Sequence, residues 1–209
     1  MTKVALITGG NRGIGLAISK AMLQQGYAVQ ILSRSELAPE VLTELQGLSE
    51  VGHTSGDVSD LTAHQRFIGD ALDRWGRIDV LVNNAGVQMA REGGLEEISD
   101  ERLDRVFTTN LHALFWLTRE ALPHLGRGSS IINVSSIQAY EPSTSLLDYA
   151  STKAAINNFT KGLAQQLAPR GIRVNAVAPG PIWTPLQVSD GQPKEALPEF
   201  GKDTPLGRA

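Results

Sequence analysis

The sequence predicts an α/β fold: a single Rossmann-type domain whose doubly wound parallel sheet carries helices on both faces. Short β-branched runs alternate with longer helical patterns along the 209 residues, and this alternation is typical of a parallel sheet. The runs at 4–7 and 80–82 are apolar throughout, as strands buried on both sides are. Right-handed crossovers leave few topologies for such a chain besides the doubly wound one.

The individual elements follow from local patterns. β-Branched and apolar runs predict strands at residues 4–8, 28–33, 51–56, 80–82, 130–134 and 173–178. Apolar residues spaced by three and four predict helices at 14–25, 37–48, 61–75, 101–125 and 146–167.

Proline and glycine are concentrated after Val177, which predicts a long irregular segment at residues 179–204. This segment follows the sixth strand, at the edge where open α/β sheets bind ligands. We expect it to face the substrate, within one domain that spans residues 1–209. Trp183, Leu186 and Phe200 are candidates for lining a substrate pocket, with packing inside the segment as the alternative reading.

Composition argues against several classes of function. With 19 Lys and Arg against 22 Asp and Glu, the net charge is −3, and no basic cluster suits nucleic acid. The chain has no cysteine, its four histidines lack metal-ligand spacing, and we expect no metal. No signal-peptide pattern and no apolar run of membrane-spanning length occurs, so a cytoplasmic protein that does not enter a membrane is the simplest expectation.

A glycine-rich turn directly follows the first strand, in the run from Thr8 to Gly15. Gly9, Gly13 and Gly15 give the spacing Gly-x-x-x-Gly-x-Gly and precede a helical pattern. Glycines here allow a tight turn and let a phosphate approach the backbone and the positive end of the helix. The position favours a dinucleotide site over a plain strand-to-helix turn.

A second group of residues indicates proton-transfer chemistry. Tyr149 and Lys153 are four residues apart on an expected helix, and Ser136 precedes them by thirteen and seventeen residues, so phenol and ammonium share one helix face. The ammonium is expected to lower the pKa of the phenol, about 10 when unperturbed, towards the working pH. This trio favours carbonyl reduction, and a chance Tyr–Lys pair is the alternative.

Taken together, these motifs resemble the short-chain dehydrogenase/reductase family. The residues that carry the resemblance are Thr8 to Gly15, Asn83-Asn84-Ala85-Gly86, Ser136, Tyr149 with Lys153, and Pro179-Gly180 with Thr184. They occur in the family's order and span almost the whole chain. The segments around Ser136 and Thr184 are most similar to the branch named for glucose and ribitol dehydrogenases, a weak guide to substrate.

The resemblance implies roles for individual residues. The catalytic residues would be Asn110, Ser136, Tyr149 and Lys153. Cofactor contacts would come from Gly9, Asn11, Arg12, Gly13, Ile14, Gly15, Ser33, Arg34, Asp57, Val58, Asn83, Ala85, Gly86, Tyr149, Lys153, Pro179, Gly180, Ile182 and Thr184. Some alternatives stay open: Asp57 as a helix cap, Asn110 as a polar residue that interrupts a helix, and Asn83 to Gly86 as an ordinary turn. Ser136 is preferred over Ser135 because the thirteen-residue interval is the family's usual one.

The end of the second strand indicates which nicotinamide cofactor is preferred. NAD enzymes of this fold usually place an acid there for the ribose 2′-hydroxyl, whereas a 2′-phosphate needs cationic and neutral donors. Here Ser33 is followed by Arg34, with Arg12 nearby in the expected geometry. We therefore expect NADP(H) to be preferred and NAD to be possible, with Glu36 as the residue that argues for NAD.

The expected function is NADP-dependent reduction of a small-molecule carbonyl, or oxidation of the alcohol, by a homodimer or homotetramer. The alternative is a non-catalytic, nucleotide-binding regulatory protein with a truncated substrate pocket. The resemblance implies a further helix and a seventh strand beyond Pro205-Leu206-Gly207-Arg208 that this sequence lacks. If the chain ends there, we expect the sixth strand to form an exposed edge.

Overall fold

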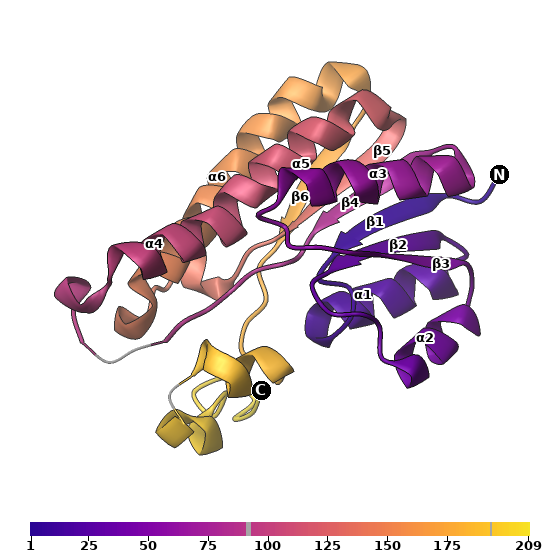
Figure 1. The fold of residues 1–209 in the computed structure, drawn as a ribbon. Helices are drawn as coiled ribbons and strands as arrows, with labels where there is room; N and C mark the ends of the chain where they lie inside the picture. The colour runs from indigo at the N-terminus through magenta and orange to yellow at the C-terminus, as the bar shows by residue number, and fades with distance from the viewer. Residues whose placement is uncertain (91–92, 193) are drawn as a thin grey trace.

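Six parallel strands form one sheet in the order β3-β2-β1-β4-β5-β6 (Figure 1). The computed structural model describes residues 1–90, 93–192 and 194–209. Within them the strands are β1 Val4–Thr8, β2 Ala28–Ser33, β3 Val51–Ser55, β4 Ile78–Asn83, β5 Leu125–Val134 and β6 Arg173–Val177. The chain reverses its winding direction between β1 and β4, which confirms the doubly wound topology.

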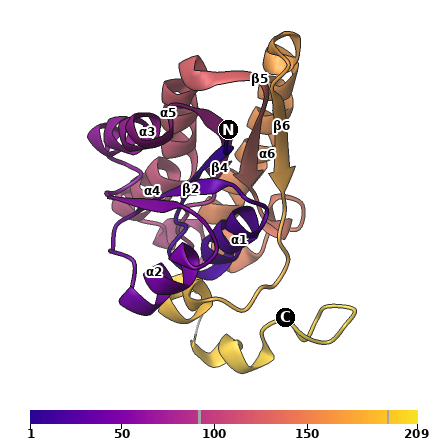
Figure 2. The same cartoon turned by 90° about the vertical axis from the view of Figure 1, so that its right-hand side faces the viewer.

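Helices cover the sheet in two layers. As Figures 1 and 2 show, α1 and α2 lie on one face, and α3, α4, α5 and α6 lie on the other. Their bounds are α1 Gly13–Gln24, α2 Pro39–Gln46, α3 Leu61–Trp75, α4 Asp100–Phe107, α5 Ala113–Ala121 and α6 Leu147–Leu167. Each face has its own apolar core, one around Phe67, Leu117 and Leu81, the other around Leu23 and Leu45.

The prediction of one continuous helix at 101–125 is wrong. The structure has α4, a π turn at Thr108–His112, then α5 and a 3-10 turn at Leu122–His124, and β5 begins already at Leu125. Pro123 in that 3-10 turn lacks the N–H that a continuing helix needs. The π turn contains Asn110, and such turns are frequent at functional sites.

The segment after β6 runs beyond the carboxyl ends of the strands, where Figures 1 and 2 draw it in orange to yellow. It was expected to be irregular, and its described part contains two short helical elements, a π-type turn at Gln187–Gly191 and a 3-10 stretch at Lys194–Glu199. β6 lies at one edge of the sheet, and most of its residues are exposed. None of the described helices combines the length and apolarity that crossing a membrane requires.

Candidate nucleotide-binding and active site

A cleft of about 750 Å³ lies at the carboxyl ends of the central strands, where the winding direction reverses. Its volume falls within the range of small-molecule sites, about 300–1,000 Å³. Nearly all the residues predicted from the sequence line it: Gly9, Asn11, Arg12, Gly13, Ile14, Gly15, Ser33, Arg34, Asp57, Val58, Ala85, Gly86, Ser136, Tyr149, Lys153, Pro179, Gly180, Ile182 and Thr184. The structure therefore brings the two ends of the predicted site into one continuous space.

Hydrogen bonds between the ends of β1 and β4 hold the glycine-rich turn in place. The Thr8 hydroxyl accepts hydrogen bonds from the backbone N–H groups of Asn84 and Ala85, both at 3.0 Å, and the Asn84 amide donates to the Thr8 carbonyl at 2.9 Å. Gly9 has φ +65°, and a Cβ on Gly15 would lie 2.6 Å from the Asn84 side chain and overlap the Gly9 carbonyl. Glycine is required there because the backbone of the turn passes so closely over the start of the helix.

The first turn of α1 is suited to bind an anion. Arg12 is its N-cap residue, but no side chain caps the helix and no acid lies in the first turn. The free N–H groups and the positive end of the helix dipole therefore face the cleft without an internal partner. These features, together with the close-packed glycines, fit the phosphates of a dinucleotide.

The end of the cleft beside β2 is polar and carries two arginines, Arg12 and Arg34. The Asn11 amide donates to the Ser35 hydroxyl at 3.0 Å, which links the glycine turn to the segment after β2. Arg34 is exposed, with Nη1 4.0 Å from a carboxylate oxygen of Asp57. Asp57 accepts from the Ser59 backbone and hydroxyl at 2.9 and 2.8 Å.

The N-cap residue of α3 is not Asp57. Asp60 holds that position and accepts from the Thr62 backbone N–H at 2.8 Å. This excludes the alternative reading of Asp57 as the cap of this helix and leaves it at the mouth of the cleft beside Val58.

Asn83, which the resemblance implies as a cofactor contact, does not line the cleft. The residue is 6% exposed, and its side chain donates to the Thr118 hydroxyl at 3.0 Å and the Asn133 amide oxygen at 2.9 Å. Side chains alternate along a strand, so Asn83 points into the helix layer while Asn84 turns to the glycine loop. Asn84 lines the cleft and was not among the predicted contacts.

Ser136 and Tyr149 meet at the inner end of the cleft. Ser136 follows β5, Tyr149 lies in the first turn of α6, and the Ser136 hydroxyl is close enough to the phenol to lower its pKa. The neighbouring Ser135 turns away from Tyr149, since its hydroxyl donates to the Lys153 carbonyl at 3.1 Å. Of the two adjacent serines, the predicted one is thus the one beside the phenol.

The expected effect of Lys153 on Tyr149 is wrong in this structure. Burial raises the pKa of Tyr149 above its ordinary value, and the nearby Ser136 hydroxyl offsets this only in part. Lys153 Nζ donates to the Val134 carbonyl at 2.8 Å and lies 5.4 Å from the centre of the Tyr149 ring. Burial lowers the pKa of the Lys153 ammonium to about 8, because a low-dielectric environment disfavours both charged forms.

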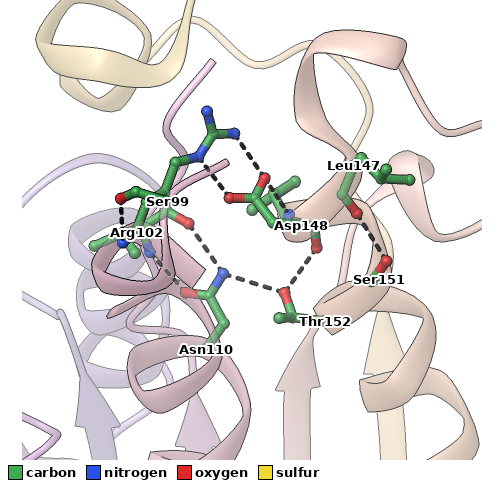
Figure 3. Close-up of polar contacts among 9 residues, drawn as sticks. Ser99, Arg102, Asn110, Leu147, Asp148, Ser151 and Thr152 are labelled. Atoms are coloured by element: carbon green, nitrogen blue, oxygen red, sulfur yellow. Dashed lines mark hydrogen bonds and ion pairs between the residues drawn. The ribbon is translucent and has the colours of Figure 1, made fainter. Parts of the chain in front are cut away.

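Asn110 does not line the cleft, and Figure 3 shows its side chain facing Thr152 of α6. Its side-chain oxygen accepts from the Val87 N–H at 2.8 Å, and its amide donates to the Val87 carbonyl at 2.9 Å and the Thr152 hydroxyl at 3.2 Å. The π turn points this carboxamide at both partners. Asn110 thereby ties the loop after β4 to α6, between Tyr149 and Lys153.

A buried ion pair beside Tyr149 was missed by the sequence analysis. Arg102 of α4 binds the Asp148 carboxylate through two hydrogen bonds of 2.7 and 2.8 Å (Figure 3). The two side chains are 9% and 1% exposed, and Asp148 also accepts from the Tyr149 N–H at 2.9 Å. This pair fixes the first turn of α6. The only hint of it in the sequence was that Asp148 directly precedes Tyr149.

The segment after β6 closes one side of the cleft. Thr184 lies close to the glycine turn, with its Cβ 3.5 Å from where a Cβ on Gly13 would stand. Leu186 lines the cleft as expected, whereas Trp183 is exposed and packs against Phe200 with ring centres 5.9 Å apart. Further lining residues that the sequence analysis missed include Val87, Gln88, Asp104, Arg105, Thr108, Thr109, Pro185 and Gln187. Asp104 and Thr108 are four residues apart along α4 and the π turn, and so are Arg105 and Thr109. Residues at this spacing share a helix face, so the sequence contained a signal for these four.

The comparisons with known proteins decide the family. The sequence profile of the family described as short chain dehydrogenase matches residues 3–195. The chain belongs to the short-chain dehydrogenase/reductase family. It is an NAD(P)-dependent oxidoreductase of that family. Among the described residues, no group of three or more His, Cys, Asp or Glu side chains is arranged to hold a metal ion.

Several members of the short-chain dehydrogenase/reductase family are similar to this chain over most of its length. NADPH-dependent aldehyde reductase 1, chloroplastic, of Arabidopsis thaliana is 44% identical, with 99% of this chain and 74% of that protein covered. Glucose and ribitol dehydrogenase homolog 2 of the same plant has the same identity and coverage, which confirms the predicted branch. A solved 3-oxoacyl-[acyl-carrier protein] reductase from Brucella melitensis in complex with NAD has a TM-score of 0.84 and 33% identity, covering 90% of this chain and 77% of that one.

Proposed function

We propose that this oxidoreductase reduces a small-molecule carbonyl to an alcohol with NADPH, using Ser136, Tyr149 and Lys153. The observation that carries the proposal is that Ser136, Tyr149 and Lys153 line the same cleft as the glycine turn, with the Ser136 hydroxyl close enough to the phenol to lower its pKa. Two hydroxyl groups that converge on one point can bind one carbonyl oxygen and stabilise the charge that develops on it.

Tyr149 is suited to donate the proton. Its raised pKa keeps the phenol protonated at neutral pH, which is the form that a general acid needs. NADPH, when bound, would supply the hydride to the carbonyl carbon. Tyr149 would then donate its proton to the carbonyl oxygen while Ser136 holds that oxygen by a second hydrogen bond.

Lys153 and Asn110 would assist this proton transfer. The Lys153 ammonium lies 5.4 Å from the Tyr149 ring centre and remains mostly protonated at pH 7, because its pKa is about 8. It would bind the nicotinamide ribose and bring positive charge to the phenolate as the proton leaves. Asn110 would keep the Gly86–Val87 loop beside Lys153 through its bonds to Val87, and its remaining lone pair is suited to a relay water.

The preference for NADP rests on the charge of the adenosine end. Arg12 and Arg34 line the cleft, and Ser33 stands where an acid would bind the ribose of NAD. Cationic and neutral donors suit a 2′-phosphate. The name of the plant aldehyde reductase agrees with this preference, while the Brucella reductase was solved with NAD.

The substrate side of the site would be formed by the segment at 179–204. Pro179, Gly180, Ile182 and Thr184 line the cleft next to Leu186, so this segment is placed to contact both the nicotinamide and the substrate. We also propose a homodimer or homotetramer, since Leu103, Phe115 and Leu147 expose apolar surface on α4, α5 and α6. Sedimentation of the purified chain measures that state directly.

The test is NADPH oxidation by the purified protein over a panel of aldehydes, ketones and sugars, repeated with NADH. Turnover of at least one carbonyl with a higher kcat/KM for NADPH is the expected result. A higher kcat/KM for NADH would contradict the cofactor preference. Tight cofactor binding without turnover of any substrate would favour the non-catalytic, regulatory alternative.

A further inference from the structure

Three side chains at the carboxyl end of β2, from β2, β3 and the loop after β2, form a hydrogen-bonded chain that the reaction itself does not use. The Ser33 hydroxyl lies 2.8 Å from His53 Nε2, and His53 Nδ1 lies 3.0 Å from a carboxylate oxygen of Glu36. His53 is on the neighbouring strand β3, and its side chain is 11% exposed, whereas Glu36 is 77% exposed. An imidazole from one strand thus connects the cleft-lining Ser33 to the one acid of the loop that follows it.

The chemistry of these groups fixes the hydrogen at the Glu36 end. A carboxylate only accepts hydrogen bonds, so His53 Nδ1 carries the hydrogen in both the neutral and the charged ring. The Ser33 hydroxyl has one hydrogen, which it can give either to Nε2 of the neutral ring or to the Ser35 carbonyl at 2.9 Å, and in the charged ring Nε2 donates to the Ser33 oxygen while the Ser35 bond is kept. In either state Glu36 is bonded to His53 rather than directed towards the cleft.

The position of Glu36 matters for cofactor choice. It lies three residues beyond Ser33, and its chain neighbour Ser35 lines the cleft, whereas Glu36 itself does not. A free carboxylate at this end would accept hydrogen bonds from the ribose hydroxyls of NAD and repel a 2′-phosphate. A carboxylate bonded to an imidazole on β3 does neither.

We propose that His53 is a specificity-determining residue that holds Glu36 away from the adenosine ribose and so keeps the cleft selective for NADP. His53 would act through Glu36 as a positioning residue, without touching the cofactor. This inference rests on the proposed cofactor preference. It also explains how a chain with an acid so near the end of β2 can accept a phosphate there.

The test uses two amides that each reproduce one nitrogen of the ring. In His53→Asn the side-chain amide stands near the place of Nδ1 and can still donate to Glu36. In His53→Gln it stands near the place of Nε2, so Ser33 keeps a partner and Glu36 is released. The readout is the ratio of the dissociation constants of NAD+ and NADP+, measured by calorimetry, which needs no turnover.

We expect His53→Gln to shift this ratio towards NAD+ by about fivefold, as the release of one exposed charge implies. His53→Asn should stay within about twofold of the wild type. In a Glu36→Gln background, His53→Gln should have no effect, since no carboxylate remains to be released. Lys20→Met, which breaks the separate Lys20–Glu44 ion pair of 2.7 Å, is the control and should leave the ratio unchanged.

An unchanged ratio in His53→Gln, or a shift that persists in the Glu36→Gln background, would overturn the inference. Equal weakening of both cofactors would show a structural role only, and thermal unfolding of each variant verifies that it is folded. A wild type that prefers NAD+ would instead contradict the proposed cofactor preference. The absolute ratio and its change on mutation therefore report on the two proposals separately.

Discussion

Replacing Asp148 by Asn should destabilise the protein strongly, although the residue is not itself proposed to react. The substitution keeps the shape of the side chain and an oxygen that can accept from the Tyr149 N–H, but it removes the charge opposite Arg102. Both hydrogen bonds of the pair are short, 2.7 and 2.8 Å, and the side chains are 9% and 1% exposed. Leaving one charge of a buried pair without its partner costs about 3–5 kcal/mol.

The free energy of unfolding of Asp148→Asn, measured in urea by tryptophan fluorescence, should therefore fall by about that amount. The matched control is Lys202→Met, which breaks a pair of 2.7 Å whose side chains are 55% and 69% exposed and should cost at most about 1 kcal/mol. Replacing Arg102 and Asp148 together by Met and Leu should recover part of the loss, because no unpaired charge remains. Equal, small losses in Asp148→Asn and Lys202→Met would refute the reasoning.

Two further predictions concern the glycine turn and a buried histidine. Gly15→Ala should weaken NADPH binding by more than about tenfold, because its Cβ would stand 2.6 Å from the Asn84 amide. Normal NADPH binding by this variant would contradict the geometry. The control is Gly69→Ala, which has open space around it and should instead stabilise α3 by about 0.5–1 kcal/mol. His64 is buried, and burial lowers its pKa from the ordinary value of 6.5. The unfolded chain therefore takes up a proton first as the pH falls below 6.5, so the free energy of unfolding should decrease there, by at most about 1.4 kcal/mol per pH unit for this one group. Urea unfolding between pH 7 and 5 should show a shallower slope in His64→Gln, and an identical slope would rule His64 out as the cause.

The strands and the glycine turn could be predicted because their signals are local. β1, β2 and β4 are short, mostly apolar runs, and Gly9, Gly13 and Gly15 follow the first of them directly. The break between α4 and α5 was harder to predict, because the apolar spacing of residues 101–125 continues through the π turn. That turn is stabilised by the contact of Asn110 with Val87, which is distant in sequence. The start of β5 was missed for a similar reason, since Leu125 belongs to both patterns.

The site residues that were misjudged depend on contacts between distant parts of the chain. Asn83 and Asn84 look equivalent in sequence, but strand alternation sends one into the helix layer and the other to the glycine turn. Arg102 meets Asp148 only because α4 packs beside α6. The pKa of Tyr149 depends on burial, which the four-residue spacing to Lys153 does not reveal.

Tyr149→Phe is the most direct test of the proton-donor role, because it removes one hydroxyl and retains the ring against Lys153. With a carbonyl substrate found in the panel, kcat at saturating NADPH should fall by about 10²–10⁴-fold, the usual contribution of a positioned general acid. The dissociation constant of NADPH, measured in the same preparation, should change little. A variant that binds NADPH normally and turns over at a rate close to that of the wild type would show that another group supplies the proton.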